Sequence, residues 1–415
     1  MLRWGSSHLR VVGMTMDAQV AIVGAGPAGA LLAFLLASRG VDTLLVERQS
    51  DFAREFRGEV LMPSGLRALS EAGISLDGIA HRAPEVLEGF LNGRRFVQID
   101  AASLGPSPPM AVSQPELLEH LVAQALATGA CELRRGHSVR AVTREDDGSI
   151  ALRLAASGAD RETTVRAPFA VGADGRSSIV RRALAHPVRQ RSTPLDVVWF
   201  KVPYPADWPG SAFRFEAGNG HLLISVRAPD DRLQVAWVIL KGTYGALRTR
   251  GIDQWIDAMC DHADPQLAAH LAREKANLTR PFLLDAVTDR VVGWSARGLL
   301  LIGDAAHTMS PVGAQGLNLA LRDAIVAANL LVPAFRGAEA LDDAAARVEA
   351  LRAPEIDRIQ RLAAIPPRIV MGRTKLHAFA RRRIASAADS RLATALARRV
   401  GSAFLDGVTD VRLGV

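Results

Sequence analysis

The chain has 415 residues, of which 49% are hydrophobic and 22% are charged, as is typical of a globular enzyme with two or three domains. Its formal net charge of +7 would suit a nucleic acid, but the arginines that carry it are spread along the chain and aromatic residues are few. We therefore expect no nucleic-acid partner. Cys131 and Cys260 lack metal-ligand spacing, and no segment approaches 18 consecutive apolar residues. These features predict a reduced, cytoplasmic protein without a metal site.

A βαβ unit follows a short N-terminal extension. Residues 1–16 contain no long apolar run, and we expect them to be disordered. Residues 18–23 and 41–46 are predicted strands, and residues 27–39 are a predicted helix between them. The second strand is followed by Glu47, so the unit has the length and the terminal acid of a dinucleotide-binding fold.

The loop between the first strand and the helix is rich in glycine. The first glycine is expected to form the tight turn, the second to let the backbone approach a pyrophosphate, and the third to let helix and strand pack closely. The helix N-terminus would add N–H groups and the positive end of the helix dipole. Glu47 is then positioned to accept hydrogen bonds from a ribose. The cofactor-binding residues predicted here are Gly24, Gly26, Pro27, Ala28 and Gly29.

Two further sets of strands are predicted. Residues 131–172 alternate between polar and apolar and indicate a β-meander that leads into the sequence Gly-Ala-Asp-Gly at 172–175. Residues 195–240 contain four predicted strands joined by short turns, which indicate a separate antiparallel sheet. In the strand 221–227, alternation separates a wholly apolar face, expected to meet a core, from a mixed face with His221 and Arg227.

The last predicted strand, 299–302, leads into Gly303-Asp304, and a helix is predicted from about residue 316 to 331. A carboxylate after the strand suits a polyhydroxyl chain. Glycines at 313 and 316 would bring backbone N–H groups close to a ligand, and a helix N-terminus beside a flavin pyrimidine would stabilise the reduced, anionic ring. Residues 252–274 and those from about 341 onward are also predicted to be helical. The motifs together indicate a flavoprotein.

In combination, these motifs resemble the single-component FAD-dependent aromatic hydroxylases, a family typified by p-hydroxybenzoate hydroxylase and the ubiquinone-pathway hydroxylases. The likeness covers roughly residues 17–335. It implies an α/β fold with a Rossmann-like FAD-binding domain, an antiparallel-sheet substrate domain and C-terminal helices. The expected boundaries are 17–85, 110–190 and 285–340 for the FAD-binding domain, 86–109 and 191–284 for the substrate domain, and 341–415 for the helical region.

The resemblance also implies a reaction. One FAD would be bound, NAD(P)H would visit transiently to reduce it, and O2 would be inserted into a small aromatic or hydrophobic substrate through a flavin C4a-hydroperoxide. Asp304 would bind a ribityl hydroxyl, and Asp174 would contact FAD and the nicotinamide cofactor. Gln114 stands where many relatives have arginine, so its contact would lack charge assistance. The other implied cofactor contacts are Arg48, Arg57, Gly303, Pro311, Gly313, Gly316, Leu317 and Asn318.

In this family the second sheet covers the flavin ring, so inward side chains of residues 195–240 are candidates for substrate contact. The polar and aromatic candidates for catalysis are His221, Tyr204, Arg227 and Arg214. Either His221 or Tyr204 would deprotonate a phenol if it faced the ring. The alternative is that the mixed face is simply solvated.

Other functions remain open on the same fold. A flavin-dependent halogenase is disfavoured because no lysine precedes Lys201 and residues 237–239 lack a second tryptophan. A reductase of isoprenoid double bonds would bind FAD without consuming oxygen, and a non-catalytic scaffold would not oxidise NAD(P)H. The arginine clusters at 381–383 and 398–399 either face solvent or contact an anionic membrane. No second glycine motif is present, so we expect no separate nicotinamide domain.

Overall fold

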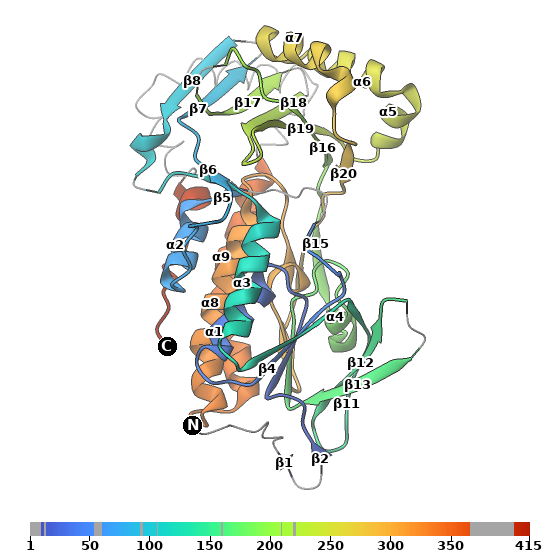
Figure 1. The fold of residues 1–415 in the computed structure, drawn as a ribbon, viewed down its shortest axis with the longest axis vertical. Coiled ribbons are helices and arrows are strands. Elements are labelled where there is room, and N and C mark those ends of the chain that lie inside the picture. The colour runs from blue at the N-terminus through green and yellow to red at the C-terminus, as the bar shows by residue number, and fades with distance from the viewer. Residues whose placement is uncertain are drawn as a thin grey trace.

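The computed structural model describes residues 10–11, 14–53, 60–91, 94–105, 107–158, 161–208, 210–218, 221–365 and 402–415. Figure 1 shows two layered parts stacked along the long axis. One part contains a parallel sheet covered by long helices, and the other contains an antiparallel sheet capped by three short helices. The predicted α/β fold class, with an antiparallel second sheet and C-terminal helices, is confirmed.

The parallel sheet has six strands in the order β10-β4-β3-β14-β23-β22. All neighbouring strands run parallel except β22, which is antiparallel to β23. Val23, Gly172 and Leu301 are in register, so the last residues of β3, β14 and β23 lie level at one edge. The bounds are β3 (Val20–Val23), β4 (Thr43–Glu47), β10 (Cys131–Arg135), β14 (Phe169–Gly172), β22 (Ser295–Ala296) and β23 (Leu299–Leu301).

Segment 131–172 differs from the predicted meander at its start. β10 pairs in parallel with β4 and is the edge strand of the six-stranded sheet, because helix α3 (Gln114–Ala127) returns the chain to that edge. The meander consists of the three strands that follow, β11 (His137–Arg144), β12 (Ile150–Ala156) and β13 (Glu162–Ala167).

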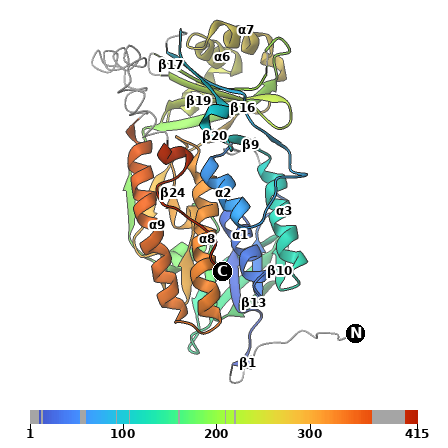
Figure 2. The same ribbon diagram turned by 90° about the vertical axis from the view of Figure 1, so that its left-hand side faces the viewer.

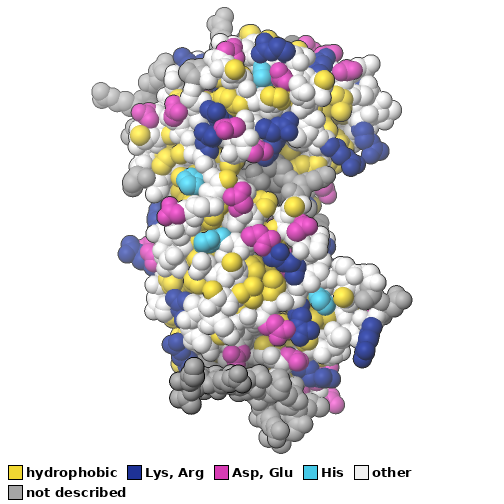
Figure 3. All heavy atoms as spheres, viewed as in Figure 1, with side chains coloured by type: hydrophobic (Ala, Val, Ile, Leu, Met, Phe, Trp, Pro, Cys, Tyr) yellow, Lys and Arg dark blue, Asp and Glu magenta, His cyan; other side chains and the backbone are white. Residues whose placement is uncertain are grey.

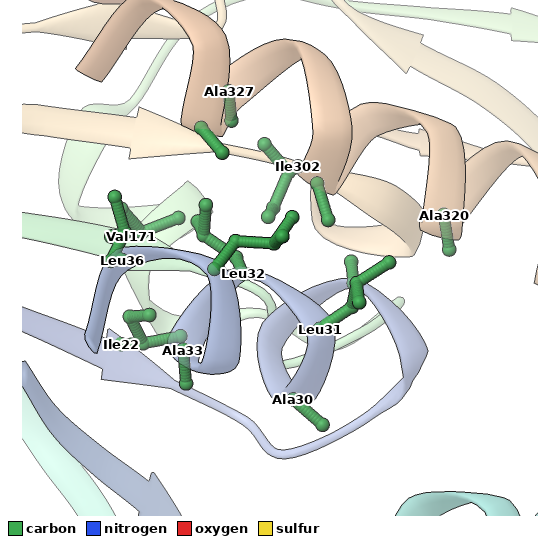
Figure 4. Close-up of a cluster of buried hydrophobic side chains, with 14 of the residues drawn as sticks. Ile22, Ala30, Leu31, Leu32, Ala33, Leu36, Val171, Ile302, Ala320 and Ala327 are labelled. Atoms are coloured by element: carbon green, nitrogen blue, oxygen red, sulfur yellow. The ribbon is translucent and has the colours of Figure 1, made fainter. Parts of the chain in front are cut away.

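Helix α1 (Pro27–Ala37) packs between the parallel sheet and helix α8 (Gln315–Phe335), and their small residues allow close contact. Figure 4 shows Leu31 and Leu32 of α1 beside Ala320 and Ala327 of α8. Helix α8 is long and apolar enough to cross a membrane, but 89% of its apolar window is buried inside the protein, as in a core helix. The remaining helices of this part are α2 (Pro63–Glu71), α4 (Ile179–Leu184) and α9 (Leu341–Ala363).

The second large sheet has seven strands in the order β20-β16-β19-β18-β17-β7-β8. Its four central strands match the predicted strands of residues 195–240, while β7 is parallel to β17. Helices α5 (Tyr244–Arg250), α6 (Ile252–Cys260) and α7 (Pro265–Arg273) cover its outer face. The strands are β7 (Val86–Leu91), β8 (Arg94–Asp100), β16 (Leu195–Pro203), β17 (Ala212–Gly218), β18 (His221–Arg227), β19 (Arg232–Leu240) and β20 (Phe282–Leu284).

Two three-stranded sheets connect these parts, with the orders β5-β9-β6 and β15-β21-β24. Their strands are β5 (Val60–Leu61), β6 (His81–Arg82), β9 (Met110–Val112), β15 (Val188–Arg191), β21 (Thr288–Val291) and β24 (His307–Thr308). Three short 3-10 helices are also present: η1 (Ala101–Leu104), η2 (Lys275–Asn277) and η3 (Gly303–Ala305).

Near both ends of the chain, the structure shows contacts that the sequence does not predict. Strand β1 (Arg10–Val11) pairs with β2 (Met14–Thr15), and Met16 is buried, so part of the expected extension belongs to the fold. At the other end, residues 402–415 run along α8 (Figure 2). The arginine clusters at 381–383 and 398–399 lie outside the described residues. On the face drawn in Figure 3, basic side chains are interspersed with acidic ones.

Candidate functional site

The three sequence motifs meet at one edge of the parallel sheet. The glycine loop follows β3, Asp174 follows β14, and Asp304 follows β23, three adjacent parallel strands that end in register. The carboxyl ends of parallel strands are where open α/β sheets bind ligands. The fold therefore gathers residues about 280 positions apart into one site (304 − 24).

The glycine loop has the geometry that the sequence predicts. Gly24 has φ +100°, and a side chain there would lie 2.5 Å from the Ala173 carbonyl oxygen. A side chain on Gly29 would lie 1.9 Å from the Gly24 oxygen, so this glycine permits close packing. Gly26 differs, because a side chain there would meet no atom within 4 Å. The open space beside Gly26 lies at the N-terminus of α1, where a pyrophosphate fits.

The acids near this edge have defined partners. Glu47, which is 3% exposed, accepts the Ala25 N–H at 2.8 Å, so its carboxylate lies against the glycine loop. Asp174 accepts the Ile179 N–H at 2.7 Å, and burial raises its pKa despite the hydrogen bonds that stabilise its charge. Asp304 is half-buried in η3. These are acceptor groups at the sheet edge, where ribose and ribityl hydroxyls would lie.

The segment 311–318 starts helix α8 beside the same edge. Gly316 has open space where a side chain would be, as at Gly26. Ala314 has left-handed backbone angles, with φ 51° and ψ 40°, and Gly313 has φ +82°. The Asn318 side chain is used within the protein, since it accepts the Met62 N–H at 2.8 Å and donates to the Ala314 carbonyl at 2.7 Å. Its predicted cofactor contact would therefore have to be made through the backbone.

The residues present fit FAD. Gly26 and Gly316 lie at the N-termini of α1 and α8, and no atom lies within 4 Å of the position that a β-carbon would take on either glycine. The backbone N–H groups at these two helix N-termini can donate to a pyrophosphate and to an anionic ring. Carboxylates at Glu47 and Asp304 offer acceptors for hydroxyl groups between them. Gln114 is half-buried as the first residue of α3, whereas Arg48 is exposed, and Arg57 lies outside the described residues.

The seven-stranded sheet covers this edge with a hydrophobic face. Val312 and Ala314 each pack against a cluster that includes inner-face side chains of the sheet, and Ile224 packs against both clusters. Strand register identifies the side chains at the centre of the inner face: Val197, Trp199, Phe213, Phe215, Leu222, Ile224, Val226, Ala236 and Val238. Among the described inner positions of β16–β19, charged side chains lie only at strand ends, at Lys201 and Arg232. Lys201 pairs with Asp230 at 2.9 Å.

The structure places the four predicted catalytic side chains on the outer face, under α6 and α7, and not over the motif edge. Arg214 forms an ion pair with Glu88 at 2.9 Å and stacks on Trp208. His221 stacks on His262 at 3.7 Å between ring centroids. Two more residues complete the set: Tyr204 donates to the Gly210 carbonyl at 2.8 Å, and Arg227 lies over the Tyr204 ring and pairs with Asp231.

These side chains do not have the inward orientation that the sequence suggests, and their role in catalysis stays a prediction. Period-two alternation separates the two faces of β18 but does not say which face meets the cofactor domain. The apolar face, with Leu222, Ile224 and Val226, is the one that covers the site, and it also continues across β16 and β19. The alternation that assigned these residues to a core is the signal that could have located them.

Comparison with known proteins agrees with this geometry. Residues 17–358 match the model of the FAD binding domain family. The chain is 32% identical, over 369 residues, to 6-methylpretetramide 4-monooxygenase of Streptomyces rimosus, covering 87% of this chain and 86% of that protein. It is 25% identical over 344 residues to p-hydroxybenzoate hydroxylase of Acinetobacter baylyi, covering 77% and 78%. It spans about half the length of a 3-(3-hydroxy-phenyl)propionate hydroxylase of Burkholderia vietnamiensis.

Among solved structures, the fold is similar to that of p-nitrophenol 4-monooxygenase from Pseudomonas putida, with a TM-score of 0.75 and 18% identity over 96% of this chain and all of that one. The fold and the site define a FAD-binding oxidoreductase. The chain belongs to the FAD binding domain family. Within that family it is a FAD-dependent monooxygenase of aromatic compounds, as the resemblance predicts.

Proposed function

We propose that this enzyme hydroxylates an uncharged, multi-ring aromatic compound, using NAD(P)H as electron donor and O2 as the source of the oxygen atom. The observation that carries this proposal is the inner face of the seven-stranded sheet. Its apolar centre extends across four strands, β16, β19, β18 and β17, which spans about 14 Å at the usual strand spacing. That width exceeds a single aromatic ring.

The charge on this face supports the same substrate class. A carboxylate-bearing substrate needs a cation or several N–H donors to replace the water that it loses on binding. Lys201 and Arg232 are engaged at one end of the β16–β19 pair, by Asp230 and by the Asn277 carbonyl. The other described inner side chains of β16–β19 are apolar or aromatic apart from Gln234. An uncharged fused-ring system would bury its surface here without the free-energy cost of removing water from a carboxylate. The name of the relative that shares 32% identity gives 6-methylpretetramide as its substrate, which makes this compound a suitable probe.

FAD, when bound, accepts a hydride from the nicotinamide cofactor and activates O2 for transfer to an electron-rich ring. The chain would bind the dinucleotide through the glycine loop and the acids at the sheet edge. The N-terminus of α8 would place its N–H groups and positive dipole end beside the reduced ring, which favours the anionic form. The apolar inner face would orient the substrate and exclude water from the reacting atoms.

The test is oxidation of NADH or NADPH by the purified, FAD-loaded enzyme in isotope-labelled O2. One reaction contains 6-methylpretetramide and another p-hydroxybenzoate, which has one ring and a carboxylate. We expect substrate-stimulated oxidation and one labelled oxygen atom in the product with the first compound alone. Stimulation by p-hydroxybenzoate alone would overturn the proposed substrate class. A reduced product without labelled oxygen would establish a reductase, and a product formed only with halide would establish a halogenase.

A further inference from the structure

Residues 402–415 contact two distant parts of the FAD-binding side of the molecule. One end lies on the loop of residues 311–314 that precedes α8, and the segment then follows α8 in Figure 2. Its course is fixed largely through its backbone. Arg322 donates to the Thr409 carbonyl at 2.6 Å, Asn329 donates to the Arg412 carbonyl at 2.7 Å, and Glu355 accepts the Val408 N–H at 2.6 Å.

The side chains that hold this backbone form a buried charge network between α8 and α9. Arg322 donates to both oxygens of Glu355, at 2.8 and 3.0 Å, and Arg352 bonds Asp323 at 2.7 Å and also pairs with Glu355. All four side chains are at most 2% exposed. Burial alone would raise the pKa of Glu355, but the two arginines outweigh it and hold the pKa at about 2. Glu355 is therefore charged whenever the protein is folded near neutral pH.

The same network reaches the motif that follows β23. Asp323 accepts the Gly303 N–H at 3.0 Å and contacts His307 Nε2 at 2.7 Å. Because Asp323 also binds Arg352, a continuous set of hydrogen bonds connects the Gly303-Asp304 turn with the backbone of residues 408 and 409. The C-terminal segment is thus attached to the predicted ribityl-binding turn as well as to α8.

At the other end of the segment, Phe404 lies on the 311–314 loop. A side chain on Gly313 would come within 2.5 Å of the Phe404 ring, so the ring packs directly on the Gly313 backbone. The Gln315 amide, 1% exposed, donates to the Gly313 carbonyl at 2.7 Å and to the Phe404 carbonyl at 2.8 Å. Leu405 and Ala314 pack against the same apolar cluster, which includes Phe213 and Val226 of the inner face. Ala314 has a left-handed conformation that alanine rarely adopts, so neighbouring contacts must hold it.

We propose that residues 402–415 position the loop that starts helix α8, with Phe404 as the positioning residue and the Arg322–Glu355 pair as its anchor. Phe404 and Gln315 hold Gly313 and Ala314 in the left-handed conformation that aims the N-terminus of α8 at the FAD ring. This inference rests on the FAD-dependent class of the enzyme and is independent of the proposed substrate. The lack of a side chain at Gly313 is accordingly needed for the close contact with Phe404, in addition to any approach of a cofactor.

The test compares Phe404→Ala with Val411→Ala in the full-length, FAD-loaded enzyme. Val411 is also buried in the C-terminal segment, but its neighbour Arg412 bonds Asn329, which lies 14 residues along α8 from Gln315. The measurements are the flavin reduction potential, by dye equilibration without substrate, and the FAD dissociation constant. A loosened helix N-terminus would stabilise the reduced, anionic ring less. We expect Phe404→Ala to lower the potential and to weaken FAD binding about tenfold, with Val411→Ala unchanged in both.

Rescue and folding are tested with two further variants. Phe404→Leu keeps an apolar side chain on Gly313, so we expect it to restore at least half of the potential shift. If Phe404→Ala does not fold, Phe404→Val provides a smaller truncation, and the expected order of potentials is wild type, Leu, then Val. A potential in Phe404→Ala or Phe404→Val equal to that of wild type would overturn the proposal. Because no substrate enters these measurements, failure of the proposed substrate class would not affect them.

Discussion

A β-carbon on Gly65 would lie only 2.0 Å from the Oδ1 atom of Asn318. Gly65 belongs to α2 and Asn318 to the first turn of α8, so these two helices meet at a hydrogen-bonding side chain. The Asn318 amide satisfies backbone groups of Val60 and Met62 as well as its own helix. The residue that the motif suggests as a cofactor contact thus also joins β5 and α2 to the helix that begins at the site.

The Gly65→Ala variant tests this contact. The added methyl group must displace the Asn318 amide, so we expect a loss of about 1–3 kcal/mol of stability, the usual cost of overpacking. Gly245→Ala is the matched control, because a side chain at that position in α5 meets no atom within 4 Å. Thermal unfolding of both apoproteins measures the difference. An equal melting temperature for Gly65→Ala and Gly245→Ala would show that the contact does not constrain α2.

The glycine loop offers a way to separate folding from cofactor binding. Gly26 has φ −69°, which alanine adopts readily, and open space at its α-carbon. We expect Gly26→Ala to leave the melting temperature of the apoprotein unchanged while it weakens FAD binding at least about tenfold, or about 1.4 kcal/mol. Gly24→Ala should instead destabilise the fold itself, because its φ is +100° and the side chain would strike backbone. Flavin fluorescence titration and thermal unfolding measure the two effects.

Two residues on opposite faces of β18 test which face of the second sheet meets the substrate. Ile224 lies on the inner face and His221 on the outer face. We expect Ile224→Ala to raise KM by about 5–30-fold, since roughly 1–2 kcal/mol of apolar contact is lost, and His221→Ala to leave KM within about twofold. Steady-state oxidation of NAD(P)H with a stimulating substrate gives both values. A large KM effect of His221→Ala in a variant with a normal melting temperature would restore the original candidate.

Glu216 predicts a pH dependence of stability. It lies on the outer face of β17, is 3% exposed, and accepts the Asp264 N–H. Burial raises its pKa to about 7 from an ordinary value of 4.5. The folded state therefore binds the proton more tightly than the unfolded state, and stability falls as the pH rises from about 4.5 to 7, by at most about 3 kcal/mol. Well above pH 7, Glu216 is ionised in both states and causes no further fall in the free energy of unfolding.

The variant Glu216→Gln mimics the protonated side chain and should remove this part of the pH dependence. Relative to wild type, its free energy of unfolding should be higher at pH 8 than at pH 5. Denaturant unfolding at the two pH values gives the comparison. A difference between variant and wild type that is the same at both pH values would mean that folding does not raise the pKa of Glu216, so that the side chain is already largely ionised in the folded protein at pH 5.

The sequence predicts that the three motifs meet in one place, but it does not predict which face of the second sheet lies over them. The glycine loop, Asp174 and Asp304 are local signals, each placed directly after a strand, and parallel pairing of those strands brings them together. The substrate face depends on which side of a sheet meets another domain, and this is decided by packing between distant residues: Ile224 and Ala314, 90 residues apart, pack against the same cluster. No pattern within β18 contains that information. Likewise, nothing near Phe404 in the sequence indicates its contact with Gly313.

The placement of β23 beside β14 has a consequence for biosynthesis. In a chain growing on the ribosome, the glycine loop and Asp174 emerge long before Leu299–Leu301, and helix α8 follows later still. Until β23 joins the sheet, the nascent protein lacks Asp304, and α1 lacks the helix that covers it. If Asp304 binds the cofactor as predicted, cofactor loading is a late event, after nearly three quarters of the chain has been made. A supply of free FAD would accordingly protect the newly released chain more than the unfinished one.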